Sequence, residues 1–267
     1  MRQEQIALKL EEVASLYPAQ LVAGQRADIP RIAFNIALSL PIGRPLERAT
    51  LCDIGGGIGL FTPGCAAIGF GRTILVDDFG DQVNVAHGET ALAVHRSYGV
   101  RIVSRDVVER GMSDLNETFD VVTCFDSMEH WHRSPKKLFH ELTGMLADNG
   151  RFILSVPNCV NLRKRLSIPF GRGKWSAMKD WYEPDTFRGH VREPDVDDLR
   201  YIAADLGLRD VQILGRNWQG HKSSNAAVRV LTRLADGILR LRPSLCSDIY
   251  LVGTKSPCHN AGQSTIR

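Results

Sequence analysis

The sequence predicts an α/β fold in which a parallel sheet is covered by helices on both faces. From residue 49 onwards, short apolar runs alternate with stretches of helical periodicity. The short runs are apolar throughout rather than at every second position, which is typical of strands buried on both faces. The 267 residues are 43% hydrophobic and 24% charged. These proportions indicate a globular protein with a large core and exclude disorder, collagen and coiled coils.

The first 48 residues are expected to form a helical segment ahead of the alternating region. Apolar residues at helical spacing predict a helix over residues 3–16, which Pro18 ends. A second helix is predicted to follow Pro30. A loop over residues 41–45, rich in proline and glycine, leads into the alternating region.

The alternating region is expected to form one domain over residues 49–255, followed by a flexible tail over residues 256–267. Ser134 is a plausible N-cap before Pro135, and Asn149-Gly150 is predicted to be a turn. Strands are predicted over residues 50–54, 73–76, 100–104, 119–125, 151–156, 211–214 and 248–254, and helices over 60–69, 81–98, 135–147, 195–206 and 226–241.

A glycine-rich turn, Asp53-Ile54-Gly55-Gly56-Gly57-Ile58-Gly59, directly follows the first of these strands and opens a helix. Glycines there let the backbone approach a ligand closely, because a Cβ would clash. The helix N-terminus presents free N–H groups and a partial positive charge. A dinucleotide site requires G-x-G-x-x-G, but the sixth position is Leu60 counted from Gly55 and Thr62 counted from Gly57. The pattern present is acid-x-G-x-G-x-G.

This pattern resembles the first motif of the class I S-adenosylmethionine-dependent methyltransferases, in their small-molecule and glycan branch of the type 11/23 kind. The resemblance covers residues 49–158 and, more weakly, 190–255. It implies a Rossmann-like, doubly wound sheet of seven mostly parallel strands with the last one antiparallel. N-terminal helices and an insert after strand five would complete this fold. It also implies S-adenosyl-L-methionine as cofactor and S-adenosyl-L-homocysteine as product.

The family holds the ribose hydroxyls with a carboxylate that closes the second strand. Asp77 lies there, 18 positions after Gly59, and each charge-assisted hydrogen bond to ribose is worth roughly 1.5–3 kcal/mol. Asp78 takes this role if the strand ends one residue later, and a surface aspartate is the alternative. The resemblance places Asp106 at the adenine amino group and Val107 as a backbone N–H donor, unless Asp106 only caps a turn. The implied cofactor contacts are Asp53, Gly55, Gly56, Gly57, Gly59, Asp77, Asp78, Asp106, Val107 and Phe125.

Methyl transfer from a sulfonium is an in-line displacement, so the protein mainly aligns the reactants, which supplies roughly 7–11 kcal/mol. A base adds about 10²–10⁴-fold when the acceptor starts protonated. Residues 124–130 resemble the family's segment that lines the methyl-transfer site. His130 is the candidate base, because an imidazole pKa of about 6.5 suits proton removal near neutrality. Glu129 would orient the His130 ring. Alternatively, His130, beside Trp131, caps or packs against the next helix, and Glu129 is a structural partner of the insert.

Residues 157–190, called the insert below, interrupt the alternation and are rich in Pro, Gly, Trp and basic residues. A loop this long inside a compact domain is usually functional. We interpret the insert as a lid over the acceptor, in which Trp175, Tyr182 and His190 contact the substrate. The alternatives are a solvated basic loop whose aromatic residues fill a satellite core and, for His190, a plain loop histidine.

Composition and charge favour a cytoplasmic protein. Six cysteines form no C-x-x-C pair, and no histidine cluster lies near them, so we expect reduced thiols and no metal site. The charged N-terminus is unlike a signal peptide, and no apolar run reaches the roughly 18 residues of a membrane span. A net charge of +3 does not indicate nucleic acid. The run Phe125-Asp126-Ser127-Met128 also lacks the Asn/Asp-Pro-Pro-aromatic sequence of nucleic-acid amino-methylating enzymes.

The predicted helix over residues 226–241 has an apolar face and several arginines. Such a helix either covers the sheet between the last two strands, which we favour, or lies on an anionic membrane near a lipid-linked substrate. Peripheral membrane contact therefore stays open.

The sequence thus predicts an enzyme that transfers a methyl group to a hydroxyl, or as a second choice an amine, of a small molecule or glycan. Two alternatives differ in class. A nicotinamide-dependent oxidoreductase would use the same sheet, but the glycine spacing disfavours it. A non-catalytic cofactor-binding protein would share the glycine turn, because binding and turnover are separable.

Overall fold

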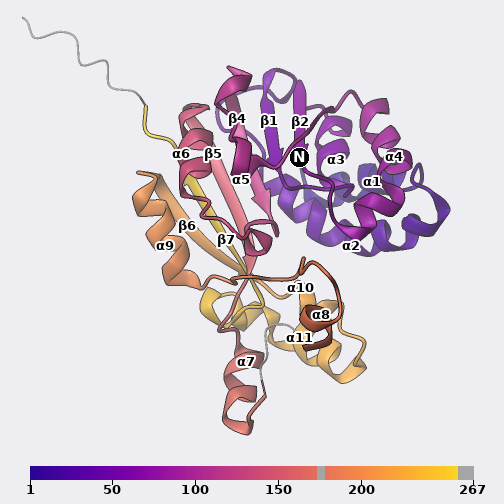
Figure 1. Ribbon diagram of the computed structural model, residues 1–267, viewed down its shortest axis with the longest axis vertical. Helices are drawn as coiled ribbons and strands as arrows, with labels where there is room; N and C mark the ends of the chain where they lie inside the picture. Colours follow the sequence, from indigo (N-terminus) through magenta and orange to yellow (C-terminus); the bar gives the residue numbers. More distant parts are fainter. Residues whose placement is uncertain (173–177, 258–267) are drawn as a thin grey trace, which may run out of the picture.

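A computed structural model describes residues 1–172 and 178–257 of the chain. Its centre is a sheet of seven strands in the order β3-β2-β1-β4-β5-β7-β6 (Figure 1). Strand β7 runs antiparallel to β5 and β6, whereas the other neighbouring strands are parallel. The predicted Rossmann-like sheet, with its antiparallel last strand, is therefore confirmed. The strands are β1 (Thr50–Ile54), β2 (Arg72–Asp77), β3 (Arg101–Ser104), β4 (Phe119–Phe125), β5 (Leu146–Pro157), β6 (Arg209–Arg216) and β7 (Asp248–Thr254).

Both faces of the sheet are covered because successive strand residues point to opposite faces and both sets are apolar. In β1, Leu51 belongs to the core on one face and Cys52 to the core on the other, and both are fully buried. The first face is covered by α1 (Gln3–Ala14), α2 (Ala19–Leu38), α3 (Phe61–Ala67) and α4 (Gln82–Ser97), and the second by α5 (Val107–Arg110), α6 (Lys136–Gly144) and α9 (Val196–Asp205).

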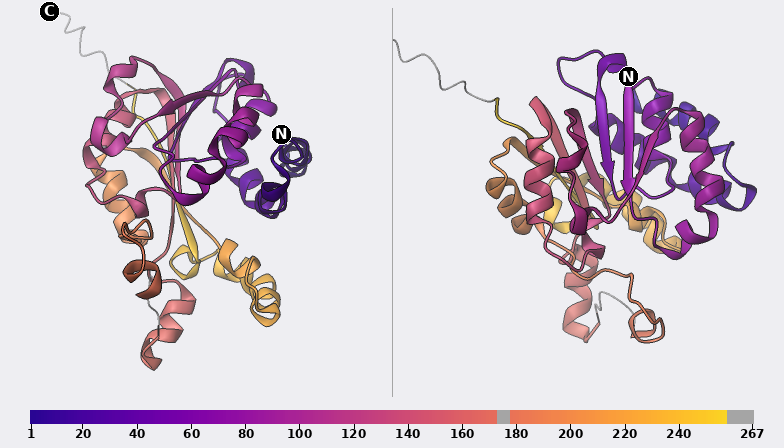
Figure 2. Two further views of the ribbon diagram at one scale, coloured as in Figure 1. Left: turned by 45° about the vertical axis from the view of Figure 1, so that its right-hand side comes forward. Right: turned by 45° about the horizontal axis from the view of Figure 1, so that its top comes forward.

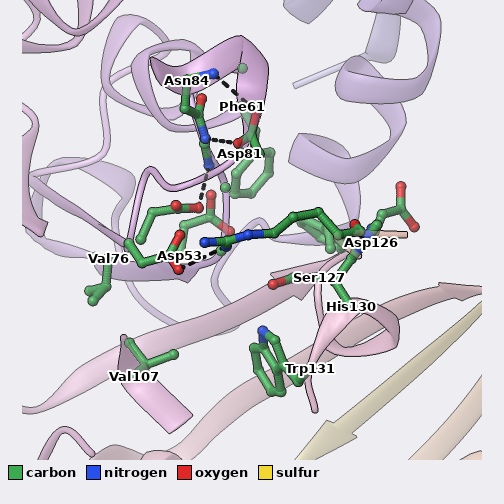
Figure 3. Close-up of a pocket in the computed structure, with 18 of the residues that line it drawn as sticks. Asp53, Phe61, Val76, Asp81, Asn84, Val107, Asp126, Ser127, His130 and Trp131 are labelled. Atoms are coloured by element: carbon green, nitrogen blue, oxygen red, sulfur yellow. Dashed lines mark hydrogen bonds and ion pairs between the residues drawn. The ribbon is translucent and has the colours of Figure 1, made fainter. Parts of the chain in front are cut away.

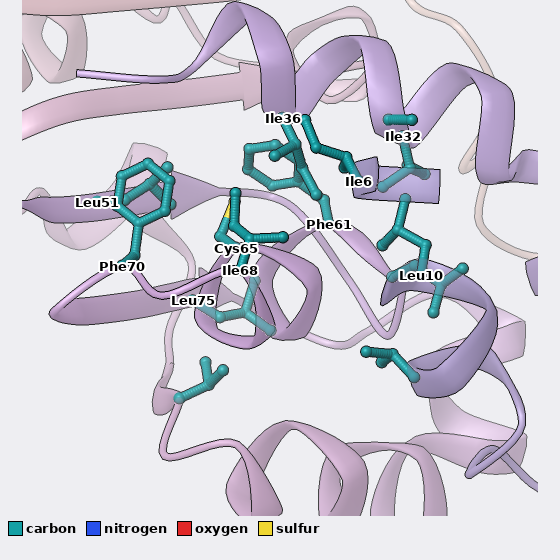
Figure 4. Packing of buried hydrophobic residues seen from close by; sticks show 14 of the residues in the cluster. Ile6, Leu10, Ile32, Ile36, Leu51, Phe61, Cys65, Ile68, Phe70 and Leu75 are labelled. Carbon is teal, nitrogen blue, oxygen red and sulfur yellow. The ribbon is translucent and has the colours of Figure 1, made fainter. Parts of the chain in front are cut away.

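The N-terminal helices belong to the core of the domain. Ile6 and Leu10 of α1, Ile36 of α2 and Phe61 of α3 pack together in the cluster shown in Figure 4. The hydroxyl of Tyr17 donates a hydrogen bond to the carbonyl of Gly59 at 3.1 Å. The N-terminal segment is thus attached directly to the glycine turn and positions one wall of the site.

Helix α2 differs from its prediction, because it begins at Ala19 and contains Pro30 in its interior. An interior proline costs a helix about 3 kcal/mol. The helix buries Ile29, Ile32 and Ile36 against the core, and each such side chain contributes about 1.5–3 kcal/mol. Burial therefore outweighs the proline, and the prediction that the helix follows Pro30 was wrong.

Two smaller predictions around β5 also changed. Asn149 lies inside β5 with a left-handed φ of 62°. The pairing of β4 with β5 shifts register between Phe119 and Val121, so the expected turn is a bulge within the strand. Helix α6 begins at Lys136 with Pro135 at the cap position. The hydroxyl of Ser134 still accepts the N–H of Lys136 at 3.3 Å.

The insert contains short helices on both sides of residues 173–177, and it extends from the end of the sheet at which β1 and β2 terminate (Figures 1 and 2). These are α7 (Leu162–Ser167), a 3-10 turn (Ile168–Phe170) and α8 (Met178–Tyr182). Helices α10 (Trp218–His221) and α11 (Ala226–Leu239) extend at the same end.

Helix α11 does not cover the sheet with its apolar face, so the packing we favoured is wrong. Leu234 and Ile238 are 76% and 74% exposed, whereas Asp236 is buried. The amide of Asn217 donates a hydrogen bond to Asp236 at 2.9 Å, which draws the polar face of α11 inward. Among the described residues, no helix is long and apolar enough to cross a membrane.

Candidate active site

A cavity of about 650 Å³ lies where β1, β2 and β4 end (Figure 3). Its walls come from the glycine turn, from α2, from the loops after β2, β3 and β4, and from the end of the insert. All ten residues expected at the cofactor line it: Asp53, Gly55, Gly56, Gly57, Gly59, Asp77, Asp78, Asp106, Val107 and Phe125.

The protein's own packing requires glycine at two positions of the turn. A Cβ on Gly55 would lie 1.9 Å from the hydroxyl oxygen of Ser127, and one on Gly56 would lie 2.0 Å from a carboxylate oxygen of Asp53. Gly55 and Gly57 also adopt left-handed φ angles of 71° and 53°. The expected reason for glycine, room for a ligand, is therefore incomplete, because neighbouring side chains fill the space at positions 55 and 56.

Asp53 supports the turn from behind. Its carboxylate is 1% exposed and accepts hydrogen bonds from the hydroxyls of Thr123 at 2.7 Å and Thr62 at 3.1 Å. Burial raises the pKa of Asp53 to about 7, although the two hydroxyls oppose this shift. This buried carboxylate holds the turn in position beside β4.

Asp77 at the end of β2 joins the second strand to the turn. One carboxylate oxygen accepts the N–H of Gly57 at 2.9 Å and the other accepts the N–H of Phe79 at 2.6 Å. Burial raises the pKa of Asp77, and the two backbone donors oppose this shift. Asp78 instead accepts the N–H of Gly80 and pairs with Arg188 of the insert at 3.3 Å.

Asp106 and Phe125 have structural partners as well as places in the cavity. Asp106 caps α5 by accepting the N–H groups of Val108 and Glu109, both at 3.0 Å, which is the capping alternative left open by the sequence. The ring of Phe125 packs edge-on against Phe61, with 4.9 Å between the ring centres.

Sequence reasoning missed an ion pair that links α2 to the end of β4. Arg31 pairs with Asp126, and also with Asp28 at 3.2 Å. Asp126 has a left-handed φ of 48° and accepts the hydroxyl of Ser155 at 2.9 Å. No sequence pattern relates positions 31 and 126, because only the packing of α2 brings them together. Asn35, 1% exposed, adds a carboxamide oxygen without a partner among the described residues.

The candidate base lies beside a second histidine. Nδ1 of His130 is 2.8 Å from the carbonyl of Arg188, and Nδ1 of His190 is 2.8 Å from the carboxylate of Glu193. Because a carbonyl and a carboxylate accept hydrogen bonds, Nδ1 carries the hydrogen in both rings, and Nε2 of a neutral His130 keeps a lone pair. The ring centres are 4.8 Å apart. Burial lowers the pKa of His130, which favours the neutral form.

Glu129, His130 and His190 form a group that we call the His–Glu cluster, and their potential ligand atoms all lie within 4.8 Å of one another. Glu129 is 1% exposed, and one of its carboxylate oxygens has no hydrogen-bond partner among the described residues. Burial, and then Asp126, raise the pKa of Glu129 well above its usual value. We expected no metal ligands; the structure brings together three groups that could hold one divalent cation, with Glu193 behind His190.

Of the residues of the insert that the structure describes, only those near its end reach the cavity. Thr186, Phe187 and Arg188 line it, and His190 contacts the ring of His130. Tyr182 is 73% exposed on α8 and does not line the cavity, so the structure does not place it at the substrate. Trp175, the third expected substrate contact, lies outside the described residues.

The cavity suits a cationic ligand with a sugar and a flat ring. Its lining includes seven aspartates and four arginines. Val76 and Val107 offer apolar surface to the cavity (Figure 3). S-adenosylmethionine carries a sulfonium and an ammonium group, two ribose hydroxyls and an adenine, and these match the excess of carboxylates and the apolar wall.

A family model described as a methyltransferase domain matches residues 26–213. No match was found among curated proteins. Among solved structures, an S-adenosylmethionine-dependent methyltransferase from Mesorhizobium loti has a TM-score of 0.54 at 15% identity, with 85% of this chain and 97% of that chain covered.

Two further solved structures show the same fold. Phosphoethanolamine N-methyltransferase 2 of Haemonchus contortus, in complex with S-adenosyl-L-methionine, has a TM-score of 0.51 at 17% identity over 80% of this chain. This chain spans 50% of that protein's length. Magnesium protoporphyrin IX methyltransferase of Synechocystis PCC 6803, with bound SAH, has a TM-score of 0.51 at 16% identity, with 88% of this chain and 84% of that chain covered.

Proposed function

We propose that this chain, which belongs to the S-adenosylmethionine-dependent methyltransferases, methylates a hydroxyl group of a small molecule or glycan, with an amine as the second choice. The structures that resemble this chain include a phosphoethanolamine N-methyltransferase and a magnesium protoporphyrin IX methyltransferase. The family therefore does not determine the acceptor, and the proposal rests on this chain's own residues.

The cofactor half of the cavity would hold S-adenosylmethionine through the glycine turn and Asp77. Bound there, the cofactor supplies a methyl group already activated on a sulfonium. Asp77 offers acceptor oxygens for the ribose hydroxyls, while the N–H of Gly57 keeps its carboxylate in place. Arg31, Asp126 and Asn35 lie on the wall contributed by α2 and β4, and we assign them to the amino-acid end of the cofactor.

The His–Glu cluster is the single observation that carries the proposed acceptor chemistry. His130 lines the cavity with a lone pair on Nε2, and burial keeps the ring neutral. A hydroxyl must lose its proton as it attacks the methyl carbon, and Nε2 of His130 would accept that proton. The carboxylate of Asp126, which opposes the lowering of the His130 pKa, would stabilise the imidazolium that forms, and Glu129 and His190 lie beside the ring. A protonated amine would need the same deprotonation before it attacks.

The test is a turnover assay with matched histidine variants. Purified chain is supplied with S-adenosylmethionine and a panel of hydroxyl and amine acceptors, and S-adenosylhomocysteine is measured by mass spectrometry. His130→Ala should lower kcat by about 10²–10⁴-fold and leave the cofactor Kd unchanged. His140→Ala is the control, since His140 lies on the exposed side of α6 and pairs with Asp205. Unaltered turnover in His130→Ala would remove this histidine from the chemistry.

A further inference from the structure

Helix α11 presents most of its large apolar side chains to solvent and the carboxylate of Asp236 to the protein. Asp236 is 8% exposed, pairs with Arg240 and lies 3.5 Å from Nε2 of His221. The guanidinium of Arg229 donates to the carbonyl of Ser223 at 2.6 Å. The outward stripe consists of Val230, Leu231, Leu234, Ile238 and Leu241, which are between 54% and 84% exposed.

The insert carries a second set of exposed apolar side chains. Among the described residues between 166 and 182, six large apolar or aromatic side chains are at least 57% exposed: Leu166, Ile168, Phe170, Met178, Trp181 and Tyr182. In Figures 1 and 2, α7, α8 and α11 all lie at the same end of the molecule, below the sheet. We call these two sets together the apolar end.

The apolar end adjoins the acceptor side of the cavity. The parallel strands terminate toward it, and the insert that carries half of it continues into Thr186, Phe187 and Arg188 of the cavity wall. Large apolar side chains that are exposed together on one part of a surface mark interaction sites. The apolar end is therefore next to the side of the cavity at which we expect the acceptor to enter.

Positive charge accompanies the apolar stripes. Residues 226–242 contain four arginines and one aspartate, and that aspartate, Asp236, is buried. Arg233 and Arg242 are exposed beside the stripe. A second copy of the chain facing the stripe would bring like charges together, whereas anionic lipid headgroups would complement them.

We propose that the apolar end docks on an anionic lipid bilayer and that the acceptor is borne on a lipid at that surface. The outward stripe of α11 and the apolar side chains of the insert would enter the boundary between headgroups and acyl chains. Arg233 and Arg242 would contact phosphate groups. The lipid-borne acceptor rests on the proposed function, whereas the docking does not.

The test is flotation of the full chain with vesicles. Binding to vesicles of phosphatidylcholine and phosphatidylglycerol should exceed binding to phosphatidylcholine alone at least tenfold, and should fall as salt rises. Leu234→Ser combined with Ile238→Ser should weaken it at least tenfold. The matched control is Leu8→Ser combined with Val85→Ser, which alters two equally exposed side chains on α1 and α4. Both double variants should keep the wild-type affinity for S-adenosylmethionine.

Two outcomes would overturn the proposal. One is equal or absent binding to both vesicle types. The other is a concentration-dependent dimer, seen by sedimentation without lipid and abolished by the α11 variant, since a second copy would then cover the stripe. Turnover of a water-soluble acceptor should not change in the α11 variant. An absence of turnover in the wild type and in both double variants would count against the proposed function and not against docking.

Discussion

The carboxylate of Asp77 accepts a hydrogen bond from the backbone N–H of Gly57, with 2.9 Å between oxygen and nitrogen. This bond ties the end of β2 to the turn after β1, across strands that are already paired along Thr50–Ile54. The end of β2 and the glycine turn, which form two parts of the proposed cofactor site, are therefore held together. A change at Asp77 acts on the turn as well as on any ribose bound there.

Replacing Asp77 with alanine should weaken cofactor binding at least tenfold, or about 1.4 kcal/mol. The variant loses an acceptor for the ribose and frees the N–H of Gly57. Calorimetric titration with S-adenosylmethionine measures the effect. Asp78→Ala should have a smaller effect, because Asp78 is directed toward Gly80 and Arg188. An unchanged Kd for Asp77→Ala would transfer the role to Asp78 or contradict ribose binding at this edge.

Replacing Gly57 with valine should abolish cofactor binding while the fold survives. A β-branched residue at a φ of 53° is strained by about 1–3 kcal/mol, and its Cβ would lie 3.3 Å from the Asn84 side chain. Binding and thermal unfolding are measured together. Gly56→Ala provides the contrast, since its Cβ would overlap the buried carboxylate of Asp53 and should lower stability first. Full binding by Gly57→Val would show that the turn does not contact the ligand.

The His–Glu cluster should bind one divalent cation, which would occupy the Nε2 lone pair of His130 and so compete with the proton transfer proposed for that ring. Three groups with lone pairs converge there, and an oxygen of Glu129 has no other partner among the described residues. Chelator-treated protein is titrated with Zn²⁺ and Mn²⁺ by calorimetry, and Co²⁺ is followed by its absorption. His190→Ala should lose the site and His140→Ala should keep it. If neither ion produces heat in wild-type protein, the predicted cation site is contradicted, and a proton on Glu129 occupies its place.

Asp53 should make stability depend on pH. Its pKa is about 7 in the folded protein, against 3.8 for the free side chain. The folded protein therefore binds the proton more tightly, and this group destabilises the fold progressively as pH rises from about 4 to above 7. Asn cannot titrate, so the unfolding free energy of wild type relative to Asp53→Asn should fall by about 2–3 kcal/mol between pH 5 and pH 8. Urea unfolding at both pH values measures it, and parallel curves for the two proteins would contradict the shift.

The outline of the fold was predictable because short apolar runs and glycine turns are local signals. β1, β4 and β7 have their predicted bounds. Pro30 misled the prediction because a local penalty was outweighed by isoleucine burial that only the packed helices reveal. Helix α11 misled it for a related reason. Its apolar stripe was assumed to face inward, but Asn217 and Asp236 form a buried polar contact that reverses the helix.

At the site, the sequence alone indicated which residues line one half of the cavity, because the residues from Asp53 to Gly59 are contiguous and Asp77 follows at the end of the next strand. Only the tertiary structure decided what these residues contact: Asp53 meets Thr123, Gly55 meets Ser127, and Asp77 meets Gly57. The acceptor half was decided by folding alone, since His130 and His190 become neighbours only when the insert returns to the sheet. Contacts between residues far apart in the chain depend on how whole elements pack, and a local pattern does not encode that packing.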